Sequence, residues 1–151
     1  DAGVGQRYFV VHAGVPRQGG SLEDIRAVNF RREIPAPPQA GEDEVFFDCM
    51  WADPQEGKGI GVNVRGPHVT SWGPDVTEKF LAASSLDLVI RSHAVPTTGR
   101  GYEWHHERRV LTVFSASNYV GTAGNMGGVA SIRQGESIEI MEHFAGSRDV
   151  L

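Results

Sequence analysis

The chain has 151 residues, of which 40% are hydrophobic and 22% charged, and it includes 19 glycines and 8 prolines. This composition excludes a disordered or fibrous protein, and the length is sufficient for one domain with a hydrophobic core and many tight turns. The formal net charge of −5 argues against a protein that binds nucleic acid through a general basic surface, because such binding requires cations that neutralise phosphates.

The chain also lacks the signatures of membrane insertion and secretion. No stretch approaches the roughly 18 consecutive apolar residues of a membrane span, and the first nine residues lack a basic start and an apolar signal stretch. The single cysteine, Cys49, excludes an internal disulfide and a cysteine-rich zinc site. We therefore expect a soluble protein without membrane partners, intracellular, in the cytoplasm or nucleus or both. The start at Asp1 rather than methionine favours a processed or excised piece of a longer protein.

The first half of the chain combines one predicted strand with two predicted helices. The apolar run 8–11 is typical of a strand, and Ser21 with Asp24 predicts the capped start of a short helix that continues through Val28. The prolines of segment 34–41 exclude a helix and predict a surface loop. Residues 42–51 are predicted to form a helix or buried turn, and residues 57–61 a loop.

The second half contains most of the predicted strands. Gly73-Pro74-Asp75 opens a helix that leads into a strand at 86–90, which makes an α/β connection. A further strand is expected at 110–114, and strands 129–132 and 137–141 flank a hairpin turn, Arg133-Gln134-Gly135-Glu136. The pattern predicts a strand-rich protein of the α+β or α/β class.

Two histidines share a position that favours a ligand site. His12 and His93 each stand at the carboxyl end of an apolar strand, where α/β sheets gather their ligand sites. The two imidazoles could converge on a metal ion, although a histidine in such a place is more often a hydrogen-bonded structural residue. Two histidines do not complete a catalytic metal site, because three or more protein ligands are usual.

Other polar residues are candidates for substrate contact. Arg65 follows Asn63 in a glycine-flanked loop and could grip a phosphoryl group through two parallel hydrogen bonds, or it is simply a surface arginine in a turn. Tyr119, beyond the third apolar run, could lend its hydroxyl to the same pocket or merely pack with its hydroxyl in water. We expect His105 and His106 to be exposed, together with Glu107, Arg108 and Arg109.

Five motifs follow one another along the chain. They are Val11-His12-Ala13-Gly14, Trp51-Ala52-Asp53-Pro54, Arg65-Gly66 followed by Trp72-Gly73-Pro74-Asp75-Val76, Ile90-Arg91-Ser92-His93, and Ser115-Ala116-Ser117-Asn118-Tyr119 followed by Gly124-Asn125-Met126-Gly127-Gly128. Their order resembles the C-terminal half of a PPP-family protein serine/threonine phosphatase, within the calcineurin-like metallophosphoesterase superfamily, and the match runs collinearly from about Tyr8 to Ile132. The residues Gly-Pro-Asp-Val, followed later by Arg-Ser-His, resemble the tetratricopeptide-containing and EF-hand-containing branches of that family.

This resemblance implies an α/β/β/α sandwich with mixed sheets and two divalent metal ions, which are manganese, iron or zinc. It implies that His12 and His93 ligate the second metal ion, that Arg65 holds the substrate phosphate and that Tyr119 lines the catalytic groove. The implied activity is the hydrolysis of phosphoserine and phosphothreonine esters on proteins.

The motifs of the family's first half, GDxHG, GDxVDRG and GNHE, do not occur in this sequence. They would supply the ligands of the first metal ion and the histidine acid, so residues 1–151 are expected to be the C-terminal portion of one catalytic domain, with at most one partial metal site. We therefore expect the parent enzyme to be active and this chain to be inactive alone, with the missing half or a regulatory protein as partner. The alternative is a noncatalytic phosphatase-like module that binds a protein partner.

Overall fold

The structure, a computed structural model, describes residues 5–145. Its central element is a four-stranded sheet in the order β1-β5-β7-β6, formed by β1 (Tyr8–Val10), β5 (Leu88–Arg91), β7 (Val110–Val113) and β6 (Tyr102–His105). Strands β1, β5 and β7 are parallel, whereas β6 runs antiparallel to β7. The sheet is therefore mixed, as expected for the predicted fold class.

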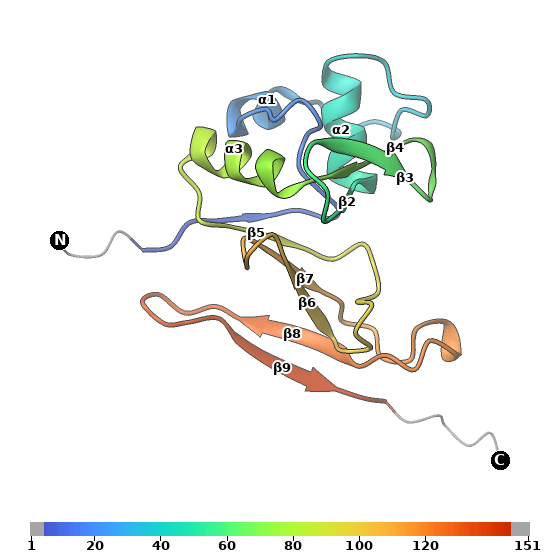
Figure 1. Ribbon diagram of the computed structural model, residues 1–151, viewed down its shortest axis with the longest axis vertical. Coiled ribbons are helices and arrows are strands. Elements are labelled where there is room, and N and C mark those ends of the chain that lie inside the picture. Colours follow the sequence, from blue (N-terminus) through green and yellow to red (C-terminus); the bar gives the residue numbers. More distant parts are fainter. Residues whose placement is uncertain (1–4, 146–151) are drawn as a thin grey trace.

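Three helices lie on one side of this sheet (Figure 1). They are α1 (Leu22–Ala27), α2 (Glu42–Trp51) and α3 (Pro74–Ser84). The predicted cap of α1 is present, since Asp24 accepts a hydrogen bond from the backbone N–H of Ser21 at 2.6 Å. The sequence predicted α1 and α3, and of the helix or buried turn expected at residues 42–51 the helix is present; the proline-rich segment 34–41 is non-helical as expected. No helix in residues 5–145 is long and apolar enough to cross a membrane.

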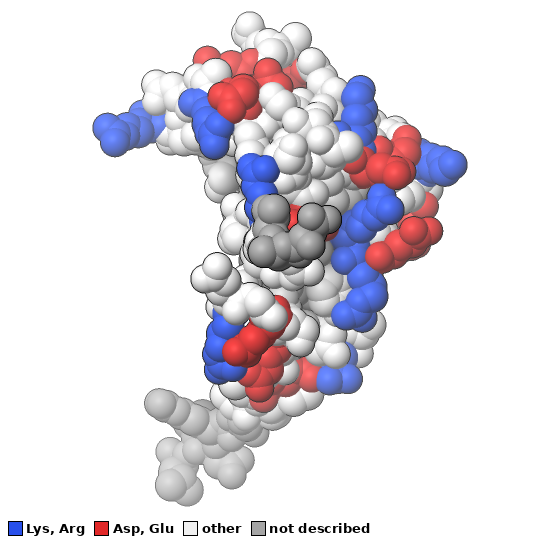
Figure 2. Space-filling view, turned by 90° about the vertical axis from the view of Figure 1, so that its left-hand side faces the viewer, with Lys and Arg blue, Asp and Glu red and all other residues white. Residues whose placement is uncertain are grey.

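The β8–β9 hairpin covers the other side of the central sheet (Figure 1). Strands β8 (Gly127–Ser131) and β9 (Glu139–His143) pair antiparallel, with Val129 opposite Met141. This confirms the predicted hairpin, although both strands are shifted by about two residues from the ranges expected from the apolar runs. On the face that Figure 2 shows, Lys and Arg side chains are interspersed with Asp and Glu.

Two hydrophobic cores follow from the alternation of side chains along β5. Val89 faces the helices and packs with Trp72 and Phe80, all of them 0% exposed. Leu88 and Ile90 face the hairpin and pack with Leu111 and with partly buried residues of both strands. Apolar burial on both faces explains why β5 and β7 read as continuous apolar runs.

A second sheet is present, and the apolar runs of the sequence did not predict its strands. It has the order β2-β4-β3 and consists of β2 (Asp53–Pro54), β4 (Gly66–Trp72) and β3 (Ile60–Asn63). The predicted loop 57–61 therefore ends earlier than expected, because β3 begins at Ile60. Strand β6 was also missed.

The prediction that His105 and His106 are exposed together with Glu107, Arg108 and Arg109 is wrong in part. His106 is only 6% exposed, and His105 and Arg109 are half-buried; Glu107 and Arg108 are exposed as expected. The imidazole of His106 bonds to the hydroxyl of Thr77 and to the carbonyl of Gln55, at 2.7 and 2.9 Å. These partners, distant in the sequence, draw the ring into the interior.

Candidate active site

The two strand-end histidines come together. His12 follows β1 and His93 follows β5, and these strands are parallel neighbours with Val10 opposite Ile90. The backbone carbonyl of His12 accepts hydrogen bonds from the N–H groups of Ser92 and His93, both at 3.1 Å. As a result His12 Nε2 and His93 Nδ1 lie 3.0 Å apart. The backbone of two adjacent strands thus holds both imidazoles at one edge of the sheet.

The environment of His93 keeps its ring neutral. Its imidazole packs against the edge of Trp51, with ring centroids 5.4 Å apart. Burial, and next the positive charge of Arg65, lower the pKa of His93 to about 4. A neutral imidazole is the form that binds metal ions. His93 Nε2 is buried without a hydrogen-bond partner in the described part of the chain.

An orphaned imidazole nitrogen beside a second imidazole fits a metal ion. A buried polar atom normally has a partner, so the unpaired Nε2 of His93 calls for a ligand at this point. Within residues 5–145 no group of three or more His, Cys, Asp and Glu side chains is arranged to hold a metal. The histidine pair therefore fits part of a metal site, and the described residues do not supply a complete one.

Arg65 lies in the turn between β3 and β4. Its backbone N–H donates to Asn63 Oδ1 at 2.9 Å, and its Nε donates to Asp53 Oδ2 at 2.7 Å. Its side chain is 35% exposed. Arg65 lines a cavity together with Ala94, the residue that follows His93, and its positive charge lowers the pKa of His93. The structure thus brings together three of the four predicted site residues.

A cavity of about 400 Å³ is lined by Arg65 and by Ala94, whereas neither His12 nor His93 lines it. Its wall includes the guanidinium groups of Arg65 and Arg91, the carboxyl groups of Asp53 and Glu103, and the side chain of Thr112. Sequence reasoning gave no role to Arg91 or Asp53, although both lie in quoted motifs. Arg91 stands in an apolar strand run, and its pairing with Asp53 joins residues 38 positions apart, so no local pattern could reveal it.

Tyr119 makes no hydrogen bond or ring contact with the other three predicted residues within residues 5–145. It begins a 3-10 turn, Tyr119–Gly121, and its ring packs edge-on against Phe114 with centroids 5.1 Å apart. The backbone N–H of Tyr119 donates to the side chain of Asn125, and the residue is 47% exposed. In the described residues it shares neither the 400 Å³ cavity nor a hydrogen bond with His12, His93 or Arg65. Its place in the groove stays a prediction.

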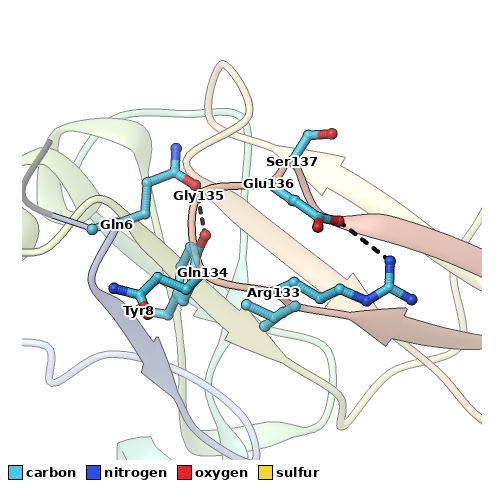
Figure 3. Close-up of a pocket in the computed structure, with 9 residues that line it drawn as sticks. Gln6, Tyr8, Arg133, Gln134, Gly135, Glu136 and Ser137 are labelled. Carbon is cyan, nitrogen blue, oxygen red and sulfur yellow. Dashed lines mark hydrogen bonds and ion pairs between the residues drawn. The ribbon is translucent and has the colours of Figure 1, made fainter.

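A larger cavity, of about 660 Å³, lies at the opposite end of β1 from His12. Figure 3 shows its lining residues, which come from the segment around Gln6 and Tyr8 and from the turn between β8 and β9. The polar groups here pair with one another: the Tyr8 hydroxyl donates to Gln6, and Arg133 pairs with Glu136 at 3.2 Å. This cavity holds no histidine, so we place the chemistry at the histidine pair.

Comparisons with known proteins agree with this geometry. The family model described as calcineurin-like phosphoesterase matches residues 1–96. This chain belongs to the calcineurin-like phosphoesterase family, and it adopts the mixed α/β fold with mixed sheets that the resemblance implied.

The similar proteins are serine/threonine phosphatases. Serine/threonine-protein phosphatase 5 of Solanum lycopersicum is 42% identical over 125 residues, which are 82% of this chain and 21% of that protein. Serine/threonine-protein phosphatase T of Saccharomyces cerevisiae is 35% identical over 137 residues, which are 89% of this chain and 25% of that protein. A solved structure of a Saccharomyces cerevisiae protein serine/threonine phosphatase, described as similar to human phosphatase PP5, matches with a TM-score of 0.76 at 30% identity. It covers 92% of this chain and 44% of that chain. The resemblance to serine/threonine phosphatases is confirmed, and this chain spans only about a fifth to a quarter of the two curated relatives.

Proposed function

We propose that the protein containing this chain hydrolyses phosphoserine and phosphothreonine esters on proteins, and that residues 1–151 form the C-terminal portion of its catalytic domain. The observation that carries the proposal is the pair of imidazole nitrogens 3.0 Å apart, with the orphaned His93 Nε2 beside them and Arg65 nearby. Two imidazoles at one edge of the central sheet, with a guanidinium from the β3–β4 turn, match the chemistry of a metal-held phosphate.

His12 and His93 would hold one divalent metal ion of a pair, and the remaining ligands would come from residues outside this chain. We propose manganese, iron or zinc, since imidazole accepts all three. When bound, such a pair of ions lowers the pKa of a bridging water and neutralises charge on phosphoryl oxygens. The neutral state of His93 allows it to serve as a ligand at physiological pH.

Arg65 would bind the phosphate of the substrate. Its Nε is engaged by Asp53, whereas Nη1 and Nη2 have no hydrogen-bond partner within residues 5–145. These two groups can donate parallel hydrogen bonds to phosphate oxygens and offset the charge that develops on them. Tyr119, whose side chain is partly exposed, would contact the ester from beyond β7.

The substrates would be phosphoproteins, and the partner of this chain would be the first half of the catalytic domain or a regulatory protein. Cys49 is a buried free thiol, which supports an intracellular place of action.

The test is a phosphatase assay on the full-length protein with a phosphoserine peptide and Mn²⁺. We expect turnover, and we expect Arg65→Ala to lower kcat/KM about 100-fold because an anion-stabilising donor is lost. The matched control is Arg26→Ala, since Arg26 is exposed and pairs with Glu23 on the same helix, α1. The 151-residue chain alone should be inactive and should regain activity with the preceding half supplied as a second polypeptide. Absence of turnover in the metal-loaded full-length protein, together with tight binding of a protein partner, would favour the noncatalytic module.

A further inference from the structure

A buried arginine, Arg91, connects the elements that carry the site. Its side chain is 1% exposed. Its Nε donates to the carbonyl of Ala13, the residue after His12, at 2.6 Å, and its Nη2 donates to Asp53 Oδ1 at 2.8 Å. Weaker contacts, each at 3.4 Å, join it to the hydroxyl of Thr112 and the carbonyl of Ala52. One guanidinium therefore links β5, the loop after β1 and the start of β2.

The positive charge of Arg91 helps to keep the carboxyl group of Asp53 ionised. Burial lowers the pKa of Arg91, and the negative charge of Asp53 opposes this effect. Burial by itself would raise the pKa of Asp53, but hydrogen bonds from Asn63 and Arg65, with the charge of Arg91, hold it below the usual value. Asp53 is thus ionised, and a buried ion pair of this kind resists separation because either partner alone would be left unpaired.

The two oxygens of Asp53 serve different partners. Oδ1 accepts from the buried Arg91, whereas Oδ2 accepts from Arg65 Nε at 2.7 Å and from Asn63 Nδ2 at 3.0 Å. Asn63 in turn accepts from the backbone N–H of Arg65. Arg65 is therefore held at its backbone and at Nε, and the two Nη groups remain for another ligand.

We propose that Asp53, anchored by Arg91, is a positioning residue that presets Arg65 to receive the phosphate of the substrate. This inference rests on the proposed function. A free arginine side chain samples many rotamers, and immobilising it on binding weakens affinity by up to about tenfold. The Arg91–Asp53 pair removes this loss in advance. Asp53 also reduces the positive charge that phosphate meets, so the two effects oppose each other and experiment can separate them.

The test measures the Kd of inorganic phosphate by calorimetry on the manganese-loaded full-length protein, together with KM and kcat for a phosphoserine peptide. We expect Asp53→Asn to raise the phosphate Kd about tenfold, with a larger change in KM than in kcat. Arg65→Ala should raise the Kd further, and the double variant should be no worse than Arg65→Ala alone, because Asp53 acts through Arg65.

Two further variants keep the test decisive. Asn63→Ala leaves the Arg91–Asp53 pair intact and should raise the Kd about threefold, but not in the Arg65→Ala background. Asp43→Asn is the matched control, since Asp43 pairs with Arg32 at 2.7 Å and is 23% exposed, against 2.7 Å and 18% for Asp53 with Arg65. It should leave the Kd unchanged.

The outcomes separate this inference from the proposed function. If the wild-type protein neither binds phosphate nor hydrolyses the peptide, the proposed function is wrong and the inference falls with it. If Arg65→Ala weakens phosphate binding while Asp53→Asn leaves it unchanged or tightens it, the inference alone is wrong. Additive effects of Asp53→Asn and Arg65→Ala would also overturn it.

Discussion

Replacing Thr77 with valine tests the buried polar network beneath the site. Trp72 Nε1 donates to Thr77 Oγ1 at 2.8 Å, and Thr77 Oγ1 lies 2.7 Å from His106 Nδ1. Because His106 Nε2 faces the carbonyl of Gln55, which can only accept, the proton of the neutral ring belongs on Nε2. The Thr77 hydroxyl must therefore donate to Nδ1, which makes a single chain of directed hydrogen bonds.

The expected magnitude follows from the burial of the two partners. Valine has nearly the shape of threonine, so Thr77→Val opens no cavity. It leaves the indole N–H of Trp72, in a residue 0% exposed, and Nδ1 of His106, in a residue 6% exposed, without partners. Each orphaned group costs about 1–3 kcal/mol, so for the two groups we expect a loss of about 2–6 kcal/mol in the free energy of unfolding.

The assay is equilibrium unfolding in urea at pH 7.5, followed by tryptophan fluorescence. The control is Thr77→Ser, which retains the hydroxyl, loses one methyl group and should cost only about 1 kcal/mol. If the valine variant is as stable as the wild type, or more stable than the serine variant, the hydrogen-bond chain does not stabilise the fold and the reasoning is refuted.

Three other predictions concern charge and exposure. Burial lowers the pKa of His106, so the unfolded state binds its proton first, and the free energy of unfolding should fall as the pH drops from about 7 to 5. His106→Gln should make this dependence shallower in urea titrations, and burial of His93 and His105, which lowers their pKa values as well, should maintain the rest; an unchanged slope would count against the prediction. Arg91→Met should lower the free energy of unfolding by about 3–5 kcal/mol, because Asp53 loses its buried cationic partner and keeps only Asn63 and Arg65. Adding Asp53→Leu should recover part of the loss, and a further loss in the double variant would contradict this. The isolated chain should self-associate in size-exclusion chromatography, because β1 is an edge strand and Val10 is 70% exposed; a monomer with a cooperative melt would show the prediction to be wrong.

The sequence predicted those strands whose own residues form a continuous apolar run. Strands β1, β5 and β7 lie in the central sheet, and their apolar runs are readable without knowledge of the neighbours. Strand β3 carries no such run: Ile60 and Val62 alternate with Gly61 and Asn63, and they are 43% and 91% exposed. Its pairing with β4 is set by the turn and the second sheet, which no short window of sequence contains.

Some residues of the site could be predicted from the sequence and others could not. His12 and His93 were predictable because each of them follows an apolar strand, and the two strands are parallel neighbours. The partnership of Arg91 with Asp53, and that of His106 with Thr77 29 residues away, arise only when the chain folds. The turn that buries His106 also places residues 106–108 at positive φ, a conformation that their residue types do not announce.

The metal content of the purified full-length protein tests most directly whether His12 and His93 form half of a two-metal site. We expect about two equivalents of divalent metal per chain by elemental analysis, and about one after the double substitution His12→Asn and His93→Asn. The matched control, His68→Asn, should retain about two equivalents of metal, because His68 lies within β4 and not at the end of β1 or β5. An unchanged metal content in the double variant would contradict the assignment.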